Sequence, residues 1–81
     1  MLPIGWMPGQ SSAIEAYRYD TPAAVLHIAY VRGRRVYDFP CPPDMFAAFE
    51  RAPSRGQYVE RVLRPYAQQQ GWSRPSYAWP W

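Results

Sequence analysis

Lysine is absent from this chain, and cysteine and histidine each occur once. A single cysteine, Cys41, excludes an intramolecular disulfide, and together with the single His27 it leaves too few soft ligands for a structural zinc site. No stretch approaches the roughly 20 apolar residues of a membrane span. The first residues also lack the basic segment and apolar run of a signal peptide. We therefore expect a cytoplasmic protein with no metal, no cofactor and no membrane contact.

Arginine supplies all nine basic residues, against six acidic ones, and the net charge is +3. A planar guanidinium binds phosphate in a bidentate manner that an ammonium group cannot match. A GC-rich gene that encodes arginine in place of lysine would give the same composition. A net charge of +3 is too modest to decide between these two interpretations.

Aromatic residues are abundant: the 81 residues include four tryptophans, seven tyrosines and three phenylalanines. A chain of this length has room for one domain, and its core alone gives only a few kcal/mol of net stability. Large rings bury roughly 150–250 Å² each. Aromatic packing is therefore expected to contribute much of the core.

Three segments predict an antiparallel β-meander: residues 13–19, 25–31 and 35–39. In the second segment Leu26, Ile28 and Tyr30 share one face, as in a half-buried strand. The first segment alternates imperfectly, which a β-bulge or burial on both faces would explain. The third follows a tight connection in which Gly33 can adopt a positive φ.

Two amphipathic helices are predicted after the strands. The run Pro42-Pro43-Asp44 favours a helix start, and Pro53 stops the first helix. Ser54 and Gln57 are spaced as a capping box for the second helix, which Pro65 is expected to end or kink near its last turn. The apolar face of the second helix comprises Tyr58, Val59, Val62, Leu63 and Tyr66.

The predicted fold class is therefore α+β. It is a three-stranded antiparallel β-meander followed by two helices packed on one face, with aromatic-rich arms at both termini.

An ordered set of features between residues 11 and 66 points to a family. The set comprises Ser11-Ser12-Ala13-Ile14, Tyr19-Asp20, the alternating Leu26, Ile28 and Tyr30, Gly33, Tyr37-Asp38-Phe39, Pro42-Pro43 with Phe46, Ala52-x-Ser54-x-Gly56-x-Tyr58, and Tyr66. This set resembles the KTSC domain, a short bacterial module named for its occurrence at the C-terminus of some lysyl-tRNA synthetases and also found as a stand-alone protein. The resemblance covers about two-thirds of the chain.

The resemblance implies a division of the chain and a direction for function. Residues 1–10 form an N-terminal arm, 11–67 a KTSC-like domain, and 68–81 a Trp-rich C-terminal tail. Two features depart from the family pattern: its central Tyr-x-Tyr is Tyr37-Asp38-Phe39 here, and the loop from there to Pro42 is one residue shorter. The family has no established activity, and its synthetase context suggests RNA.

Catalytic residues are not expected. His27 is the one base with an ordinary pKa near neutrality, and it lies mid-strand opposite the apolar face. Cys41 between two prolines is typical of a small buried hydrophobe rather than a reactive thiol. Ser54 already has a role as a helix cap. We therefore expect a binding protein and not an enzyme.

RNA binding, to tRNA or to a single strand, is the first functional hypothesis. Tyr37 and Phe39 lie on one face of a predicted strand, as do the stacking aromatics of sheet-based RNA-binding domains. The candidate phosphate contacts are Arg32, Arg34 and Arg35, with Arg55 and Arg61 as secondary ones. The alternative for the two aromatics is that the helices pack on them as core residues.

Protein binding is the second hypothesis. Tryptophan and arginine are enriched at binding hot spots, and the tail combines Trp72, Arg74, Trp79 and Trp81. The partner would be a host protein or a second copy of the chain. The alternative is a tail that only caps the hydrophobic core of its own domain.

Overall fold

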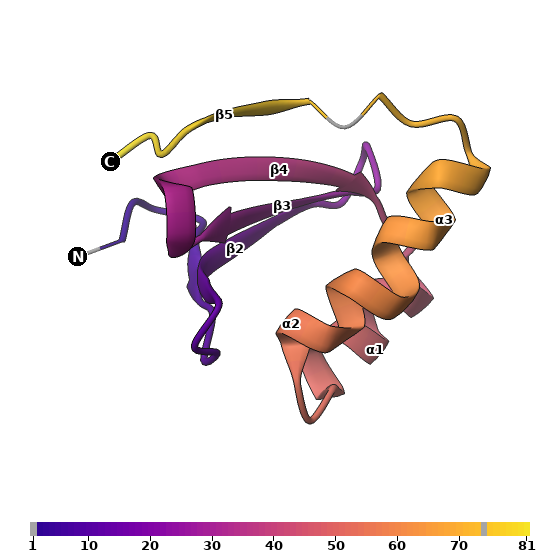
Figure 1. Ribbon diagram of the computed structural model, residues 1–81, viewed down its shortest axis with the longest axis horizontal. Coiled ribbons are helices and arrows are strands. Elements are labelled where there is room, and N and C mark those ends of the chain that lie inside the picture. The colour runs from indigo at the N-terminus through magenta and orange to yellow at the C-terminus, as the bar shows by residue number, and fades with distance from the viewer. Residues whose placement is uncertain (1, 74) are drawn as a thin grey trace.

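The computed structural model describes residues 2–73 and 75–81, which form one five-stranded antiparallel sheet with helices against one face (Figure 1). The strands lie side by side in sequence order. They are β1 (Met7–Pro8), β2 (Ile14–Asp20), β3 (Val25–Tyr30), β4 (Arg35–Pro40) and β5 (Ser76–Ala78).

The predicted meander corresponds to β2, β3 and β4. The predicted number of three strands is wrong, because each terminal arm adds an edge strand: β1 pairs with β2, and β5 pairs with β4. Both added strands are only two or three residues long. A segment this short shows no alternation that could reveal it in the sequence.

The imperfect alternation in β2 has both of the expected causes. The register against β3 shifts between Ile14, opposite Tyr30, and Ala16, opposite Ala29. This bulge lets Ile14 join the core beneath the helices, while Ala16 is buried on the opposite face. The sheet is therefore covered on both sides.

The helical part contains α1 (Pro43–Arg51) and one continuous helix made of α2 (Arg55–Tyr58), the π-helical η2 (Val59–Leu63) and α3 (Arg64–Gln69). A short 3₁₀ turn, η1 (Arg32–Arg34), joins β3 to β4, with Gly33 at φ 81°. No helix within residues 2–73 and 75–81 is both long enough and apolar enough to cross a membrane.

Pro65 does not end the second helix, which continues to Gln69. The π turn lies directly before the Arg64-Pro65 step, where proline lacks the N–H for a regular helical bond. A π-helical turn contains more residues than an α-helical turn. The side chains that follow it are therefore rotated about the helix axis, and a different set of residues faces the core. The residues buried on this helix are Val59, Leu63 and Ala67. Val62, which the sequence places on the same apolar face, is 37% exposed.

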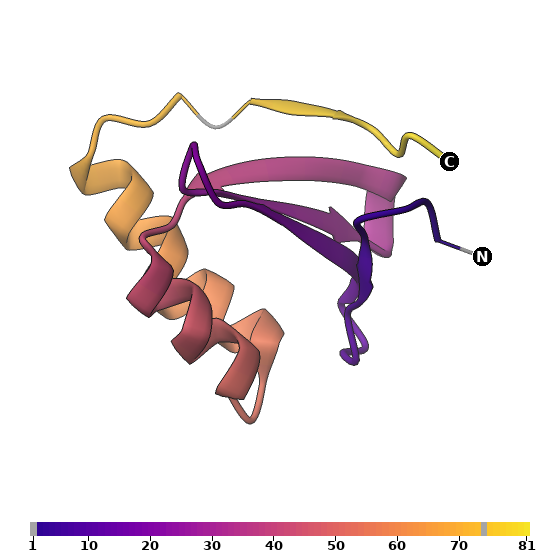
Figure 2. The same ribbon diagram turned by 180° about the vertical axis from the view of Figure 1, so that it is seen from behind.

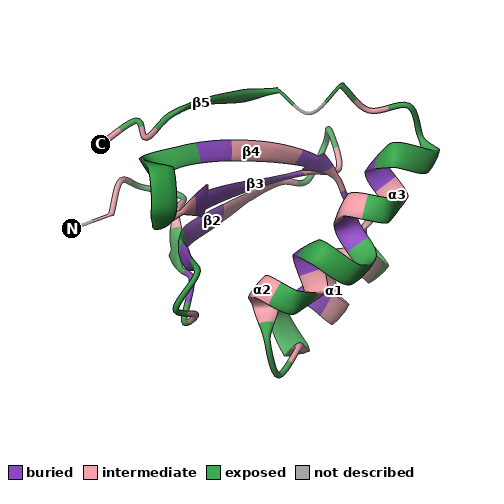
Figure 3. Ribbon diagram, viewed as in Figure 1, coloured by how far each residue is buried: buried purple, intermediate pink, exposed green. Residues whose placement is uncertain are grey.

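The main core lies between the sheet and the helices, and the buried segments of the two layers face one another (Figure 3). The strands contribute Ile14, Tyr17, Leu26, Ile28 and Phe39. The helices contribute Phe49, Val59, Leu63 and Ala67. Phe46 and Tyr19 stack beside this core with ring centroids 4.1 Å apart.

A second, smaller cluster covers the opposite face of the sheet. Ala16, Ala29 and Val36 are fully buried there. The residues that pack over them come from the two terminal arms: Leu2, Trp6, Trp79 and Trp81. Figure 2 shows both termini at the same end of the sheet, away from the helices, and the rings of Trp6 and Trp81 are 4.9 Å apart. The tail therefore folds back on its own domain, which is the self-capping arrangement considered as an alternative to protein binding.

Candidate functional site

A groove runs between the N-terminal turn of the second helix and the end of the sheet where β2 begins and β3 ends. The part beside the second helix is a hollow of about 320 Å³, lined by Ser11, Ser12, Ala13, Tyr30, Ser54, Gly56, Gln57, Glu60 and Arg61. An adjoining hollow of about 480 Å³ is lined by Ser12, Ala13, Tyr30, Val31 and Arg32. Because the two hollows share three residues, we treat them as one feature, the Tyr30 groove.

Close approach of two chain segments forms one wall of the groove. A Cβ atom placed on Gly56 would lie 3.5 Å from the Cβ of Ala13 and 3.8 Å from Oγ of Ser11. The Val31 N–H donates to the carbonyl of Ala13 at 3.0 Å, which fixes this segment beside the end of β3. The Ser11-Ser12-Ala13 and Ser54-x-Gly56 motifs, distant in sequence, thus meet at this groove.

Tyr30 lines both parts of the groove. Its hydroxyl is buried and has no hydrogen-bond partner within the part of the chain that the structure describes. Burial raises the pKa of Tyr30 to about 12, with a smaller contribution from the Glu60 carboxylate and an opposing one from Arg64. The hydroxyl therefore stays protonated and neutral at physiological pH.

Two arginines from different elements stand at the groove. Arg32 comes from η1 and Arg61 from η2. Among residues 2–73 and 75–81, no carboxylate forms an ion pair with either of them. The one acidic lining residue, Glu60, is paired with Arg64 at 3.0 Å. The groove therefore carries uncompensated positive charge.

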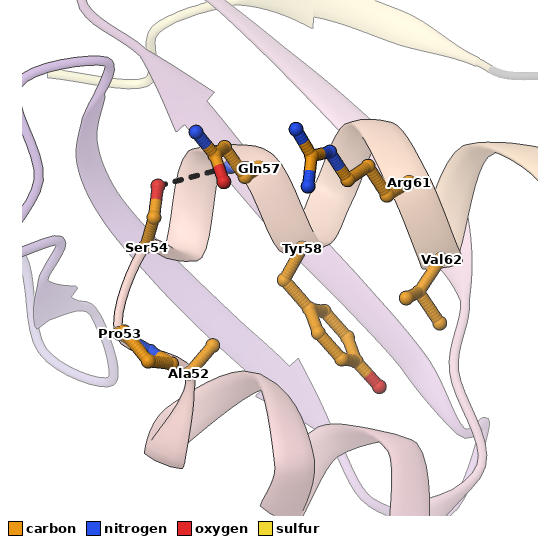
Figure 4. Close-up of a pocket in the computed structure, with 7 residues that line it drawn as sticks. All are labelled: Ala52, Pro53, Ser54, Gln57, Tyr58, Arg61 and Val62. Atoms are coloured by element: carbon orange, nitrogen blue, oxygen red, sulfur yellow. Dashed lines mark hydrogen bonds between the residues drawn. The ribbon is translucent and has the colours of Figure 1, made fainter.

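Figure 4 shows how the second helix divides its side chains. Gln57 and Arg61 project side by side from one side of the helix, whereas Tyr58 and Val62 point toward α1. The dashed bond in the figure is the N-terminal cap, in which the Gln57 N–H donates to Oγ of Ser54 at 3.3 Å. The predicted capping role of Ser54 is confirmed, and the cap positions Gln57 at the groove.

The predicted phosphate contacts lie in two places, the β3–β4 connection and the second helix. Arg32, Arg34 and Arg35 are exposed together at the β3–β4 connection. The Arg34 guanidinium lies 4.6 Å from the ring centre of Trp79, and Nη2 of Arg35 donates to Oγ of Ser76 at 3.0 Å. These contacts with the tail orient the two guanidinium groups but leave them at the surface.

Arg55 belongs to the scaffold. Its guanidinium donates to the carbonyl oxygens of Gly9 and Glu50, both at 3.0 Å, and lies 5.1 Å from the ring centre of Tyr17. These contacts tie the N-terminal arm to both helices. These contacts give Arg55 a structural role, and its role as a secondary phosphate contact stays a prediction.

The two aromatics proposed for base stacking lie on the helix side of the sheet. Phe39 is 1% exposed, sits opposite Leu26 in β3, and belongs to the main core. Base stacking on Phe39 is thus a wrong prediction, because the helices cover its ring. Tyr37 is half-buried beside the same core and meets Tyr30 edge to face, with ring centroids 5.5 Å apart.

The tail tryptophans contact their own domain. Nε1 of Trp72 donates to the carbonyl of Asp38 at 2.8 Å, and Nε1 of Trp79 donates to that of Tyr30 at 3.0 Å. Trp81 stacks on Trp79. Arg74 lies outside the residues that the structure describes. These contacts agree with self-capping, while a role in protein binding stays a prediction.

The polar residues considered for catalysis do not converge. Nδ1 of His27 lies 2.6 Å from a carboxylate oxygen of Asp38, on the sheet face opposite the helices. Cys41 is buried, and Ser54 caps a helix on the other side of the sheet. Within the described chain, no group of three His, Cys, Asp or Glu side chains is placed to hold a metal ion.

Sequence reasoning missed the partner of His27 and most of the Tyr30 groove. The Asp38 contact was accessible, because a hairpin that turns at Gly33 brings β3 and β4 into the register that pairs His27 with Asp38. The groove had no such local signal. It depends on how closely the second helix approaches the segment before β2.

A five-stranded antiparallel sheet with two helices on one face places the chain in the α+β class. Residues 10–66 match the KTSC domain family, and the chain belongs to this family. A protein of Tsukamurella paurometabola is 33% identical over 58 residues, which cover 72% of this chain and 87% of that protein.

A solved structure extends the similarity of fold. The crystal structure of a KTSC domain protein from Yersinia pestis has a TM-score of 0.68 and 22% sequence identity, covering 90% of this chain and 93% of that one. The shared fold therefore reaches beyond the residues that match the family and includes parts of the terminal arms.

Proposed function

We propose that this protein is a non-catalytic RNA-binding module that holds single-stranded RNA along the Tyr30 groove and the neighbouring arginine-rich connection. One observation carries the proposal: Arg32 and Arg61, from separate elements, flank one groove and have no carboxylate partner among the described residues. Proteins that bind single strands use a positively charged groove that follows the phosphate backbone. The occurrence of the family in lysyl-tRNA synthetases also supports RNA, including tRNA, as the ligand.

The exposed Arg34 and Arg35 extend this positive surface beyond the groove. A guanidinium stacked on an aromatic ring, as Arg34 is on Trp79, keeps the N–H groups at its edge free for phosphate. The contact of Arg35 with Ser76 likewise leaves donors unused. The phosphate backbone of the RNA would thus pass from Arg61 across Arg32 to Arg34 and Arg35.

Fluorescence anisotropy with labelled single-stranded RNA and tRNA, over a series of salt concentrations, tests the proposal. We expect micromolar or tighter binding at low salt and a logarithmic slope of about −0.7 for each phosphate contacted. The double variant Arg32→Ala/Arg61→Ala should bind more weakly and show a shallower slope. Arg34→Ala/Arg35→Ala should act in the same direction.

Arg51→Ala is the matched control for charge. Arg51 is exposed at the end of α1 and does not line the groove. The variant loses one positive charge from another surface and should reduce affinity less than Arg61→Ala. Absence of binding at low salt, or equal losses for Arg51→Ala and Arg61→Ala, would contradict the proposal.

Protein binding is the second candidate. The observation that favours it is the apolar character of two exposed features, the N-terminal arm with Ile4 and Met7, and a shallow hollow of about 240 Å³ beside Tyr58 and Val62 (Figure 4). The half-exposed Trp79 completes the apolar surface at the arm. Sedimentation velocity of the chain over a concentration series would reveal self-association, which is the simplest form of this function.

A further inference from the structure

The part of the Tyr30 groove that lies beside the second helix is a hollow of about 320 Å³. We propose that it holds the base of one unpaired nucleotide, while Arg61 and Arg32 contact the phosphates on either side of that nucleotide. This inference rests on the RNA-binding function proposed above and names the part of the RNA that the groove recognises.

The size of the hollow suits a compact group. Its volume of about 320 Å³ lies near the lower end of the roughly 300–1,000 Å³ typical of small-molecule sites. A phosphate backbone that only follows a charged surface needs no such depression. A base turned away from its neighbours would fill the hollow and leave its sugar and phosphates at the rim.

The lining offers both donors and acceptors, as the edge of a base requires. The Gln57 side chain carries a carbonyl and an amide group, and the hydroxyls of Ser11 and Ser12 can donate or accept. Oγ of Ser11 accepts the N–H of Ala13 at 3.2 Å, which leaves its O–H free to donate. A site built for phosphate alone would need donors only, so this mixed set favours a base.

The position of the charged groups fits the same ligand. Gln57 and Arg61 are one helical turn apart and project in the same direction (Figure 4), so an amide that contacts the base has a guanidinium beside it for the adjacent phosphate. Gly56 contributes no side chain to the wall and keeps the hollow open. Glu60, the acidic group in the lining, is neutralised by Arg64.

A base in this hollow must be unpaired. To enter the hollow, a base must leave the stack of its neighbours, and in a duplex this would also break its pairing. Sequence-specific RNA recognition targets mostly single-stranded segments, whose bases can be splayed out and bonded at their edges. The proposal therefore excludes recognition of double-stranded RNA at this site.

The experiment compares two labelled single-stranded RNA oligomers by anisotropy: one with bases, and one of equal length in which every nucleotide is abasic. The two ligands carry the same phosphates, so the arginines contact both equally. We expect the protein to bind the abasic oligomer about tenfold more weakly, which corresponds to the loss of contacts worth one decade in affinity. Gln57→Ala should remove most of this difference by weakening binding of the normal oligomer alone.

Gln68→Ala is the matched control, because Gln68 is an exposed glutamine of the same helix outside the groove. It should preserve the full difference between the oligomers. Gly56→Ala provides a second variant, whose added methyl group narrows the hollow at this wall, and alanine is more favourable than glycine in a helix. A folded Gly56→Ala protein should therefore also lose preference for the normal oligomer.

The outcomes separate the two proposals. Equal affinity for both oligomers, with binding still dependent on Arg32 and Arg61, overturns the base site and leaves RNA binding intact. A difference that Gln57→Ala and Gln68→Ala change to the same extent also overturns the base site. No binding of either oligomer at low salt overturns the RNA-binding function and this inference with it.

Discussion

At the scale of single residues, burial decides the chemistry of Cys41. Its side chain is fully buried, and burial raises the pKa of Cys41 to about 12, with a further contribution from the Asp44 carboxylate. The thiolate is the reactive form of cysteine. A thiol that remains protonated and covered has the role of a small core residue, as its place between two prolines suggested.

The first prediction is that Cys41 does not react in the native protein. At about pH 8, where a free cysteine with a pKa near 8.5 is partly ionised, iodoacetamide should leave the folded protein unmodified and modify it after denaturation. Mass spectrometry of samples taken over time measures this. Rapid modification without denaturant would show that the region around α1 opens frequently.

The second prediction concerns stability at alkaline pH. The pKa of Tyr30 is raised from 10.0 to about 12 and that of Cys41 from 9.0 to about 12. A raised pKa means that the folded state holds its proton more tightly, so the stabilising effect is complete below the unfolded pKa and disappears as the pH rises toward the folded pKa. The free energy of unfolding should therefore fall between about pH 9 and 12.

The variant Tyr30→Phe separates the contribution of the Tyr30 hydroxyl to the alkaline loss of stability from that of the other titrating groups. Urea denaturation at several pH values should show a shallower alkaline decline for this variant, because the ring remains but the titrating group is gone. At neutral pH its stability should stay within about 1 kcal/mol of the parent, since the hydroxyl has no hydrogen-bond partner to lose among the described residues. An unchanged alkaline decline would indicate that Tyr30 is accessible to hydroxide in the folded state.

The third prediction distinguishes the two aromatics of β4. Phe39→Ala removes a ring that is 1% exposed and should cost about 3–5 kcal/mol, enough to unfold a domain of this size. Tyr37→Ala should cost less, because Tyr37 is only half-buried at the edge of the core. Thermal denaturation followed by circular dichroism compares them. Similar stability for the two variants would contradict the assignment of Phe39 to the core.

At the scale of elements, the sequence predicted those that carry a local signal. The alternation of Leu26, Ile28 and Tyr30 indicated β3, and the Ser54 cap indicated the start of the second helix. The two edge strands and the π turn lacked such a signal. Their formation depends on long-range contacts, since β1 and β5 exist only by pairing with β2 and β4.

The same distinction applies to the candidate site. Arg32 and Arg61 could be named from the sequence as exposed positive residues, but their presence at one groove could not. It follows from the way the second helix packs, with Gly56 close to Ala13 and Ser11. Phe39 was misassigned because periodicity identifies the residues that share a face without indicating which face the helices cover.

The fourth prediction tests the tail as an element. Deletion of residues 72–81 removes β5, the indole that bonds to Asp38, and the rings that cover Ala29 and Val36. We expect a large loss of stability in urea denaturation, because apolar surface on both faces of the sheet becomes exposed. A truncated protein that keeps its stability would instead favour the protein-binding role of the tail.

At the scale of the whole molecule, proline restricts both edges of the sheet. β1 has only two residues, one of which is Pro8, and Pro75 and Pro80 flank β5. The N–H of Asp38 donates to the carbonyl of Pro75, and the N–H of Trp79 donates to the carbonyl of Arg34, so residues 75 and 79 direct these backbone groups toward β4. The residues that alternate with them in the tail direct their backbone groups away from β4, toward the free edge of the sheet. The last residue whose backbone faces the free edge is Pro80, which has no N–H to donate to another strand. Short edges bounded by proline disfavour the addition of another strand.

The fifth prediction follows from these edges: the protein stays monomeric over a concentration series, because its short, proline-bounded edge strands offer little to a further strand. Sedimentation velocity over a concentration series measures this, and Pro80→Thr supplies the comparison, because threonine restores an outward N–H and is compatible with a strand. The variant should self-associate more readily than the parent. A parent protein that already dimerises, at a surface unaffected by Pro80→Thr, would direct attention away from the sheet edge to the exposed Ile4 and Met7 of the arm, and would favour protein binding over RNA binding as the main function.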